Sequence, residues 1–316
     1  MAALTLSPRA RRLLQLGFGA AVVVGTVAVV GTGPLLRGVM AISPGAILAS
    51  ALLTGVATLA AAWRWRTVSS ELGLPMRWTT AVAAYYRSQF LNTVLPGGVL
   101  GDVHRAYRQG RRAGDVPIAA RAVATERIAG QVVQFALVVA VLISLGLTGP
   151  LTVVEWVAGG AAAVVLVALL VAVATARGRR VLRRELSRLR QVFGAPRASL
   201  AIVASSVVVV AAHSATFIVA CLAVGVGASP RELVALAVIA LAAASLPINV
   251  GGWGPREAAS ASAFAVIGLG AGAGLAASTA FGVLTTIAVL PGAVVLIVER
   301  FAAPRTVPAR REERTA

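Results

Sequence analysis

The sequence reads Leu246-Pro-Ile-Asn-Val-Gly-Gly-Trp-Gly-Pro-Arg-Glu257 in the middle of an otherwise apolar region. A second stretch of this kind comes earlier, as Phe90-Leu-Asn-Thr-Val-Leu-Pro-Gly-Gly-Val-Leu-Gly-Asp-Val-His-Arg105. Both combine proline and paired glycine, which break helices, with charged residues. In a bilayer, broken backbone is tolerated only where it is buried in protein or lines a wet cavity. The two breaks therefore indicate a site inside a membrane protein.

The composition is typical of a helical membrane protein. Of the 316 residues, 58% are hydrophobic, and the mean hydropathy is +0.87. A soluble domain of this composition would lack polar surface. The net charge of +18 comes from 29 basic residues, all Arg, and they lie in loops beside apolar runs. We therefore expect them to meet anionic lipid headgroups rather than nucleic acid.

Six apolar runs approach or exceed the roughly 20 residues that a helix needs to cross the hydrocarbon core. The loop between Arg177 and Arg197 holds eight Arg, so it is expected on the cytoplasmic side, as are both termini. The absence of Lys and the abundance of Ala, Val, Gly and Leu suggest a bacterial protein, located in the inner membrane. The expected spans are 13–32, 45–63, 127–147, 153–174, 200–224 and 275–298.

Two further segments do not fit single crossings. The segment 79–97 begins and ends inside, whereas 232–270 begins outside and must return there. The halves of the second, Leu233–Ser245 and Ala258–Gly268, are each about 20 Å long or less, too short to span. We predict a re-entrant helical hairpin here and a counterpart from the inside at 79–97, as an inverted repeat would produce. Two short full spans in 232–270 are the alternative, and charge counting does not separate them.

The predicted fold is therefore an all-α, polytopic membrane protein with about six full spans and one or two re-entrant hairpins. Residues 1–300 form one integral membrane domain, and 301–316 a disordered basic cytoplasmic tail. The single Cys221 excludes an intramolecular disulfide, and two isolated His do not suggest a metal site. The sequence has no Gly-Lys-Ser/Thr phosphate loop and no evident nucleophile–base pair, so we expect neither a cofactor nor an enzyme activity.

Charged residues at membrane depth are candidates for function. Arg256 and Glu257 follow Pro255, which suits a helix start, so free N–H groups and Arg256 could bind phosphate. Arg256 could instead pair with Glu126 or Asp102 to hold the bundle together. The other candidates of this break would let a headgroup approach the backbone or hydrogen-bond to it: Asn249, Gly251, Gly252 and Gly254.

The first break offers a similar set of candidates. Asp102 could bind an ion or headgroup, or could cap a short helix. Glu126 and Arg127, at the mouth of the third span, either form an interfacial pair facing different ways or pair with the tips of the breaks. The remaining candidates are Asn92, Pro96, Gly97, Gly98, Gly101 and Arg105.

Four motifs, in their order and spacing, resemble the lysylphosphatidylglycerol synthase transmembrane family, also called flippase-like membrane proteins. They are Phe90–Arg108, Thr125-Glu-Arg127, Leu246–Glu257 and Leu290-Pro-Gly292, and the resemblance covers roughly residues 10–300. It implies a membrane domain related to the flippase half of the multiple peptide resistance factor, which moves aminoacylated phosphatidylglycerol between leaflets. The resemblance covers every candidate residue named above other than Asn249. It also matches Pro247, Pro291 and Gly292.

The 316 residues hold no stretch like the soluble aminoacyl-transfer domain, so we do not expect synthase activity. The expected function is translocation of an anionic or aminoacylated phospholipid, or of another phosphate-headgroup lipid. The alternatives are a secondary transporter for a small anion, and an accessory protein that binds a polyprenyl-linked sugar or a cell-envelope glycosyltransferase. The expected partners are membrane lipids, with a homo-oligomer or an envelope-synthesis enzyme as further options.

Overall fold

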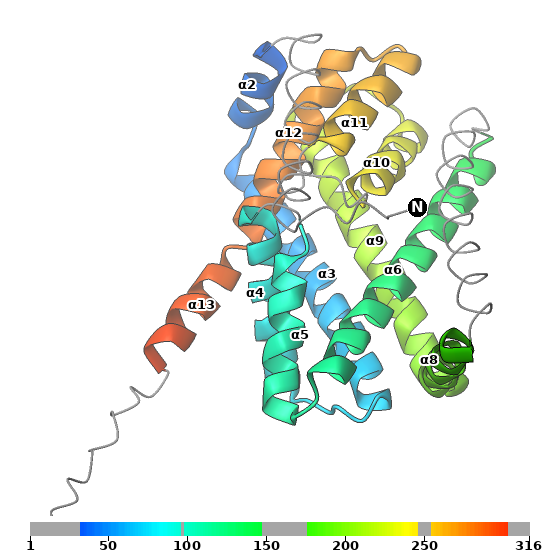
Figure 1. Ribbon diagram of the computed structural model, residues 1–316. Helices are drawn as coiled ribbons and strands as arrows, with labels where there is room; N and C mark the ends of the chain where they lie inside the picture. The colour runs from blue at the N-terminus through cyan, green and yellow to red at the C-terminus, as the bar shows by residue number, and fades with distance from the viewer. Residues whose placement is uncertain (1–31, 96–97, 147–175, 246–253, 303–316) are drawn as a thin grey trace, which may run out of the picture.

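The computed structural model describes residues 32–95, 98–146, 176–245 and 254–302. All regular structure in these residues is helical, as predicted (Figure 1). Four segments are long and apolar enough to cross a membrane: Pro44–Glu71, Val116–Ser144, Pro196–Ala223 and Ala271–Phe301. The protein is a polytopic helical membrane protein. The spans predicted at 13–32 (apart from Thr32) and 153–174 lie outside the described residues, as does nearly all of the tail at 301–316.

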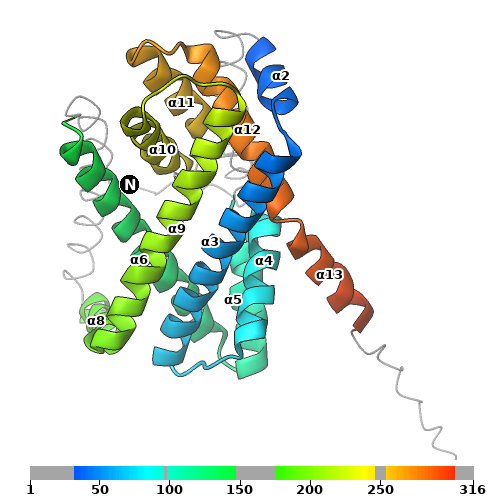
Figure 2. The same ribbon diagram turned by 180° about the vertical axis from the view of Figure 1, so that it is seen from behind.

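The long helices form the body of the bundle. Helices α3 (Pro44–Glu71) and α9 (Pro196–Ala223) run side by side, with α6 (Val116–Ser144) and α12 (Ala271–Ala288) packed against them (Figure 2). The buried faces of α3 and α9 are rich in Ala, Ser and Thr. Small residues let helices approach closely where lipid surrounds the bundle. Helix α2 (Gly33–Met40) packs against α12, and α8 (Ala176–Gly194) against the start of α9.

Four shorter helices form two pairs. Helices α4 (Trp78–Val94) and α5 (Leu100–Ala113) have 17 and 14 residues, whereas α10 (Pro230–Ala244) and α11 (Pro255–Val266) have 15 and 12. At 1.5 Å per residue each is about 18–26 Å long, less than the ~30 Å of a hydrocarbon core. The pairs lie toward opposite ends of the bundle, with the inner ends of their helices toward its middle (Figures 1 and 2). The two short helices predicted within 232–270 are confirmed; their re-entry into the membrane stays a prediction.

Local capping explains where several helices begin. The Ser43 hydroxyl accepts a hydrogen bond from the Ala46 N–H at 3.1 Å. Ser229 and Glu232 form a capping box at the start of α10, and the hydrogen bonds from Ser229 lower the pKa of the Glu232 carboxyl. The Asp115 carboxylate accepts from the Ile118 N–H at 2.9 Å, so α6 begins at Val116.

That start corrects one prediction. The third span was expected to begin at residue 127, but its helix begins eleven residues earlier, at Val116. Asp115 and Pro117 supply the start signal, a capping carboxylate and a proline in the first turn. Glu126 and Arg127 consequently lie inside a long helix rather than at its mouth.

The apolar core has its largest cluster where α9, α10, α11 and α12 meet. Phe217, Phe264 and Phe281 belong to it, and the rings of Phe217 and Phe281 lie 5.6 Å apart. Cys221 is a free, buried member of the same cluster. A second cluster around Trp65 and Tyr85 packs α3 against α4. The two clusters hold the short pairs against the long helices.

The last described helix, α13 (Pro291–Ala302), follows α12 after a break at residues 289–290 and extends away from the bundle (Figure 1). It packs on α4 through Gly292, where an added Cβ would lie 2.3 Å from the Tyr86 carbonyl oxygen. Only glycine allows so close a contact with backbone. Farther along, the Glu299 carboxylate pairs with Arg87 and Arg108.

Candidate functional site

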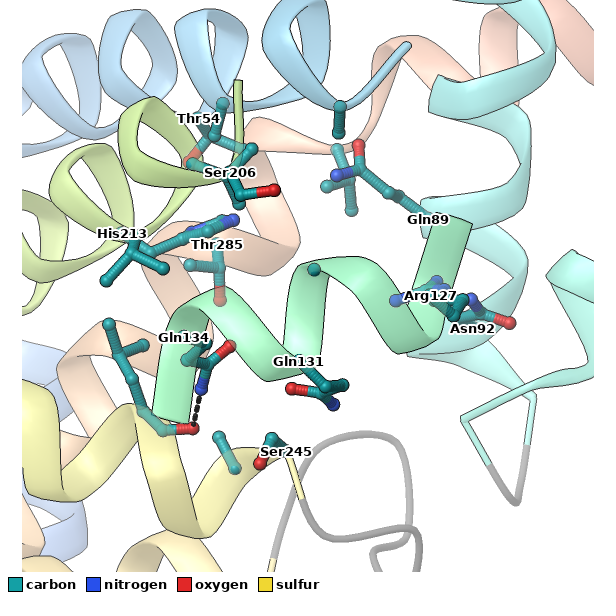
Figure 3. A pocket seen from close by; sticks show the side chains of 18 of the residues that line it. Thr54, Gln89, Asn92, Arg127, Gln131, Gln134, Ser206, His213, Ser245 and Thr285 are labelled. Atoms are coloured by element: carbon teal, nitrogen blue, oxygen red, sulfur yellow. Dashed lines mark hydrogen bonds between the residues drawn. The ribbon is translucent and has the colours of Figure 1, made fainter. Parts of the chain in front are cut away.

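A polar pocket of about 340 Å³ lies where the inner ends of the two short pairs meet. Asn92, Thr93 and Gly98 reach it from the first pair, and Ala244 and Ser245 from the second. Helices α3, α6, α9 and α12 complete its wall (Figure 3). Its polar lining residues are Thr54, Arg64, Tyr85, Gln89, Asn92, Thr93, Arg127, Gln131, Gln134, Ser206, His213, Ser245 and Thr285. This polarity is exceptional within a bundle of apolar helices and marks the pocket as the candidate site.

Helix α6 contributes a polar stripe to the pocket. Arg127, Gln131 and Gln134 are spaced by four and three residues, so they share one face of the helix. The Gln134 amide donates to the Leu241 carbonyl oxygen at 2.9 Å, which ties α6 to α10 (Figure 3). The Gln131 Oε1 atom is buried and accepts no hydrogen bond from the described residues. It is therefore available to a ligand in the pocket.

Glu126 organises the charges beside the pocket. Its carboxylate is fully buried and accepts hydrogen bonds from Arg64 Nη2 at 2.6 Å and Nε at 2.9 Å, both on Oε1. The Tyr85 hydroxyl lies 3.2 Å from the same oxygen, and Arg105 Nη2 donates to Oε2 at 3.1 Å. Ion pairing of this kind is what makes a buried carboxylate tolerable. Of the two explanations offered by the sequence, pairing with a tip residue is therefore confirmed for Glu126.

Asp102 forms the second centre of the network. Its carboxylate accepts from Arg127 Nη2 at 2.6 Å, Arg105 Nη2 at 3.0 Å, Ser88 Oγ at 2.9 Å and Asn92 Nδ2 at 3.3 Å. Asp102 lies in the first turn of α5, whose N-cap is Val99, so the alternative in which Asp102 caps the helix is wrong. Arg127 belongs with this network, because it pairs with Asp102.

Asn92 and Gly101 join the two helices of the first pair. The Gly101 N–H donates to Asn92 Oδ1 at 2.7 Å. A Cβ at Gly101 would lie 2.0 Å from the Ser88 carbonyl oxygen, so α4 and α5 can meet here only because this residue is glycine. The contact holds Asn92 at the pocket and Asp102 directly behind it.

The charges favour an anion in the pocket. Arg64, Arg105 and Arg127 carry three positive charges, and Asp102 and Glu126 carry two negative ones, which leaves an excess of one positive charge. Arg64 and Arg127 line the pocket, whereas the lining residues of the described chain include no carboxylate. The Arg127 side chain is 43% exposed. A guanidinium in such a position can bind phosphate or carboxylate through two parallel hydrogen bonds.

The second break places its charges outside this pocket. The Arg256 guanidinium donates to Glu257 Oε1 from Nη2 at 2.5 Å and to Ser278 Oγ from Nε at 2.9 Å. The Gly254 N–H donates to Glu257 Oε2 at 2.6 Å, so Glu257 caps the start of α11. Arg256 is 4% exposed, and its guanidinium lies over the ring of Phe281. Phe281 also lines the pocket. The pairing of Arg256 with Glu126 or Asp102, offered as an alternative, is not observed; its contacts with Glu257 and Ser278 join α11 to α12.

The chain matches the family described as lysylphosphatidylglycerol synthase TM region over residues 12–292. It belongs to this family. No curated protein and no solved structure matches the chain. The match to the lysylphosphatidylglycerol synthase TM region includes all four motifs from which the resemblance was inferred, and it relates this membrane protein to the handling of lipid.

The predicted site residues of this family member divide into four groups. Asn92, Gly98 and Arg127 line the pocket. Gly101, Asp102, Arg105 and Glu126 form the network behind it. Gly254, Arg256 and Glu257 form the separate cluster at α11. Pro96, Gly97, Asn249, Gly251 and Gly252 lie outside the described residues, as does Pro247.

Sequence reasoning missed several lining residues. The second span was expected to end at residue 63, which leaves Arg64 outside it, yet Arg64 lies within α3 and is 5% exposed. The stripe of Gln131 and Gln134 was detectable, because polar residues three apart in an apolar helix share one face. Gln89 shows the same kind of spacing with Asn92 and Thr93 and was detectable in the same way. Ser206 and His213 carried a weaker signal, because each stands beside only one other polar residue and its neighbours across the bundle are set by the fold.

Proposed function

We propose that this protein moves a phospholipid with an anionic or aminoacylated phosphate headgroup between the leaflets of the bacterial inner membrane. The observation that carries the proposal is the polar pocket with its excess positive charge, placed where the two short helix pairs meet. In this account the headgroup enters the pocket and the acyl chains stay in lipid. Ile128 and Val132 are exposed apolar residues of α6 that stand next to its lining residues in the sequence, and they supply a surface for those chains.

The charge of the network suits such a headgroup. A phosphodiester carries one negative charge, which would neutralise the single excess positive charge of the three guanidiniums and two carboxylates. Arg127 is the best placed donor, because it lines the pocket and is the most exposed of the three. An amine on the headgroup would find acceptors in the side-chain oxygens of Gln131 and Asn92. Burial of the pocket among helices would reduce the cost of carrying a charged headgroup through lipid.

The proposed path is defined by the two short pairs. We infer that α4–α5 and α10–α11 enter the membrane from opposite sides and meet at the pocket, so that a headgroup could reach it from either leaflet. The Arg-rich side, which contains the ends of α5 and the whole of α8, is proposed to face the cytoplasm. No separate energy-supplying or synthase activity is part of the proposal.

A secondary transporter for a small anion is the second candidate, favoured by the same excess positive charge. Two assays on purified protein in vesicles separate the candidates. The first follows exchange between leaflets of phosphatidylglycerol labelled on an acyl chain, and the second follows uptake of radiolabelled phosphate into the lumen. We expect lipid exchange above that of protein-free vesicles and no phosphate uptake. Uptake without lipid exchange would replace the proposal by the second candidate. The absence of both activities would favour an accessory lipid-binding role.

A further inference from the structure

A second cavity, of about 310 Å³, lies at the Arg-rich end of the first short pair, apart from the pocket described above. It is enclosed by the end of α3, the loop before α4, and the facing sides of α4 and α5. Trp65, Leu74, Pro75 and Met76 form one wall. Five guanidinium groups line the rest: Arg77, Arg87, Arg105, Arg108 and Arg112. The lining residues of the described chain include no carboxylate.

Several buried donors at this cavity have no partner in the part of the chain that the structure describes. Arg105 Nε and Nη1 make no hydrogen bond to any described residue, although the Arg105 side chain is 0% exposed. Within the described residues, Arg87 Nε and Gln109 Nε2 are likewise buried donors without an acceptor, and Gln109 Oε1 is a buried acceptor without a donor. An unsatisfied buried donor is costly, and the cost is greater for a charged group. The geometry thus leaves guanidinium and amide donors without acceptors around a space large enough for a small anion.

Arg105 is held so that its two ends serve different sites. Its Nη2 atom donates to Asp102 and Glu126 in the network behind the first pocket. The guanidinium lies between the rings of Trp65 and Tyr85, with its carbon 4.4 Å from each ring centroid. Stacking between two aromatic rings fixes the plane of the group. Nε and Nη1 are therefore held in place without an acceptor among the described residues.

The charge at the cavity is also incompletely balanced. Besides Arg105, four arginines line it, and among the described residues they pair with a single carboxylate, that of Glu299. Glu299 pairs with both Arg87 and Arg108, and its oxygens lie 2.6 Å from Arg87 Nη1. Arg77 and Arg112 form no ion pair with any described residue. Four positive charges and one negative charge leave an excess of three.

We propose that this cavity binds a phosphate monoester or inorganic phosphate, and that the Glu299 carboxylate of α13 competes with it for Arg87 and Arg108. A dianionic phosphate offers several acceptor oxygens to the unpartnered donors and offsets most of the excess charge. Because Glu299 holds two of the same guanidiniums, binding of the anion and docking of the end of α13 weaken each other reciprocally. The site is distinct from the headgroup pocket, and its existence does not depend on lipid transfer.

The test measures binding of inorganic phosphate to the purified full-length protein in detergent, by titration calorimetry at constant ionic strength with chloride as the replaced anion. We expect saturable binding. The double variant Arg77→Gln/Arg112→Gln removes two exposed arginines that form no ion pair with a described residue, and should weaken binding about tenfold or more. Glu299→Gln should tighten it. Arg121→Gln, at a half-buried arginine of α6 that lies outside the cavity, should leave it unchanged.

A second arm distinguishes the source of the phosphate. The same variants are compared for binding to nanodiscs of phosphatidylcholine with and without phosphatidic acid, whose headgroup is a phosphate monoester. Binding of both probes indicates a lipid headgroup site, whereas binding of inorganic phosphate alone indicates a soluble ligand. The proposal is overturned if neither probe binds saturably, if the double variant binds as tightly as the wild type, or if Glu299→Gln does not tighten binding. None of these readouts involves transfer between leaflets, so they are independent of the proposed function.

Discussion

Arg64 on α3 and Glu126 on α6 lie 62 positions apart in the sequence, and their Nη2 and Oε1 atoms are 2.6 Å apart inside the bundle. Their side chains are 6% and 0% exposed. Arg64 also donates to Ser206 Oγ on α9 at 2.9 Å, so one guanidinium connects three long helices. The same guanidinium lines the polar pocket. The pocket and the stability of the bundle therefore depend on a common set of charges.

Replacing Glu126 with Gln should destabilise the protein strongly. Arg64 and Arg105 would then face each other's charge around a neutral amide, and loss of one partner of a buried ion pair costs about 3–5 kcal/mol. Thermal unfolding in detergent, followed by circular dichroism, measures the effect. Glu185→Gln is the matched control, because the pairs of Glu185 with Arg121 and Arg188 are half-buried and reach solvent; screening by solvent leaves such pairs contributing about 1 kcal/mol or less. Equal effects of the two substitutions would contradict the role given to Glu126.

Gly101→Ala should separate the first pair of short helices. The new Cβ would lie 2.0 Å from the Ser88 carbonyl oxygen, a backbone atom that cannot move alone. Overpacking of this kind costs about 1–3 kcal/mol, and more if the hydrogen bond from Gly101 to Asn92 is lost. Gly194→Ala is the control, since a Cβ there would meet no atom within 4 Å. A Gly101→Ala protein as stable as the Gly194→Ala protein would refute the close contact.

Gln131→Leu should reduce lipid exchange while leaving stability equal or higher. The buried Gln131 Oε1 accepts no hydrogen bond from the described residues, so removing it sacrifices no contact in the fold. A headgroup in the pocket would lose an acceptor. Exchange in vesicles and thermal unfolding are measured on the same preparations, with Val203→Leu on the exposed face of α9, outside the pocket lining, as control. Loss of exchange with an equal loss of stability would indicate a structural role instead.

The opposed arrangement of the short pairs can be tested by cysteine labelling. The native Cys221 is buried and is replaced by Ser, after which a single cysteine is introduced at Ala113 or at Gly227. We expect an impermeant thiol reagent to label Gly227→Cys in whole cells and Ala113→Cys only in inverted vesicles. Ala113 is the last residue of α5, and Gly227 lies in the loop before α10. Labelling of both positions from one common side would contradict the two opposed hairpins.

The sequence predicted the fold class and the two interrupted regions because these depend on local composition. Runs of Ala, Val and Leu predict α3 and α9, and Pro255 marks the start of α11. It did not predict the first turns of α6, because the polar residues between Asp115 and Arg127 resemble a loop when charge alone is counted. The capping signal of Asp115 and Pro117 was present but unused.

The site was predictable only in part. Charges near the breaks identified Asp102, Glu126 and Arg127, but their partners were set by packing between helices distant in the sequence. Arg64 and Arg66 stand on either side of Trp65 at the end of an apolar run, a pattern that suits a membrane interface. Residues 64 and 66 point to different sides of α3, because residues two apart in a helix do not share a face. Arg64 is therefore 5% exposed, whereas Arg66 is exposed and donates to the Met76 carbonyl oxygen. The sequence assigned phosphate binding to Arg256. In the structure Arg127 is the better candidate, because packing places Arg127 and not Arg256 in the lining of the pocket.

The central claim is that Arg127 in the pocket receives the phosphate of a lipid that changes leaflet. The most direct measurement compares exchange of acyl-labelled phosphatidylglycerol between leaflets by the wild type, Arg127→Gln and Arg121→Gln, reconstituted at equal density after equal folding has been verified. Arg121 belongs to the same helix and pairs with Glu185 outside the pocket. We predict that Arg127→Gln lowers the exchange rate about tenfold or more, as expected for loss of a charged hydrogen bond to phosphate, and that Arg121→Gln matches the wild type. Equal exchange by all three proteins would contradict the account.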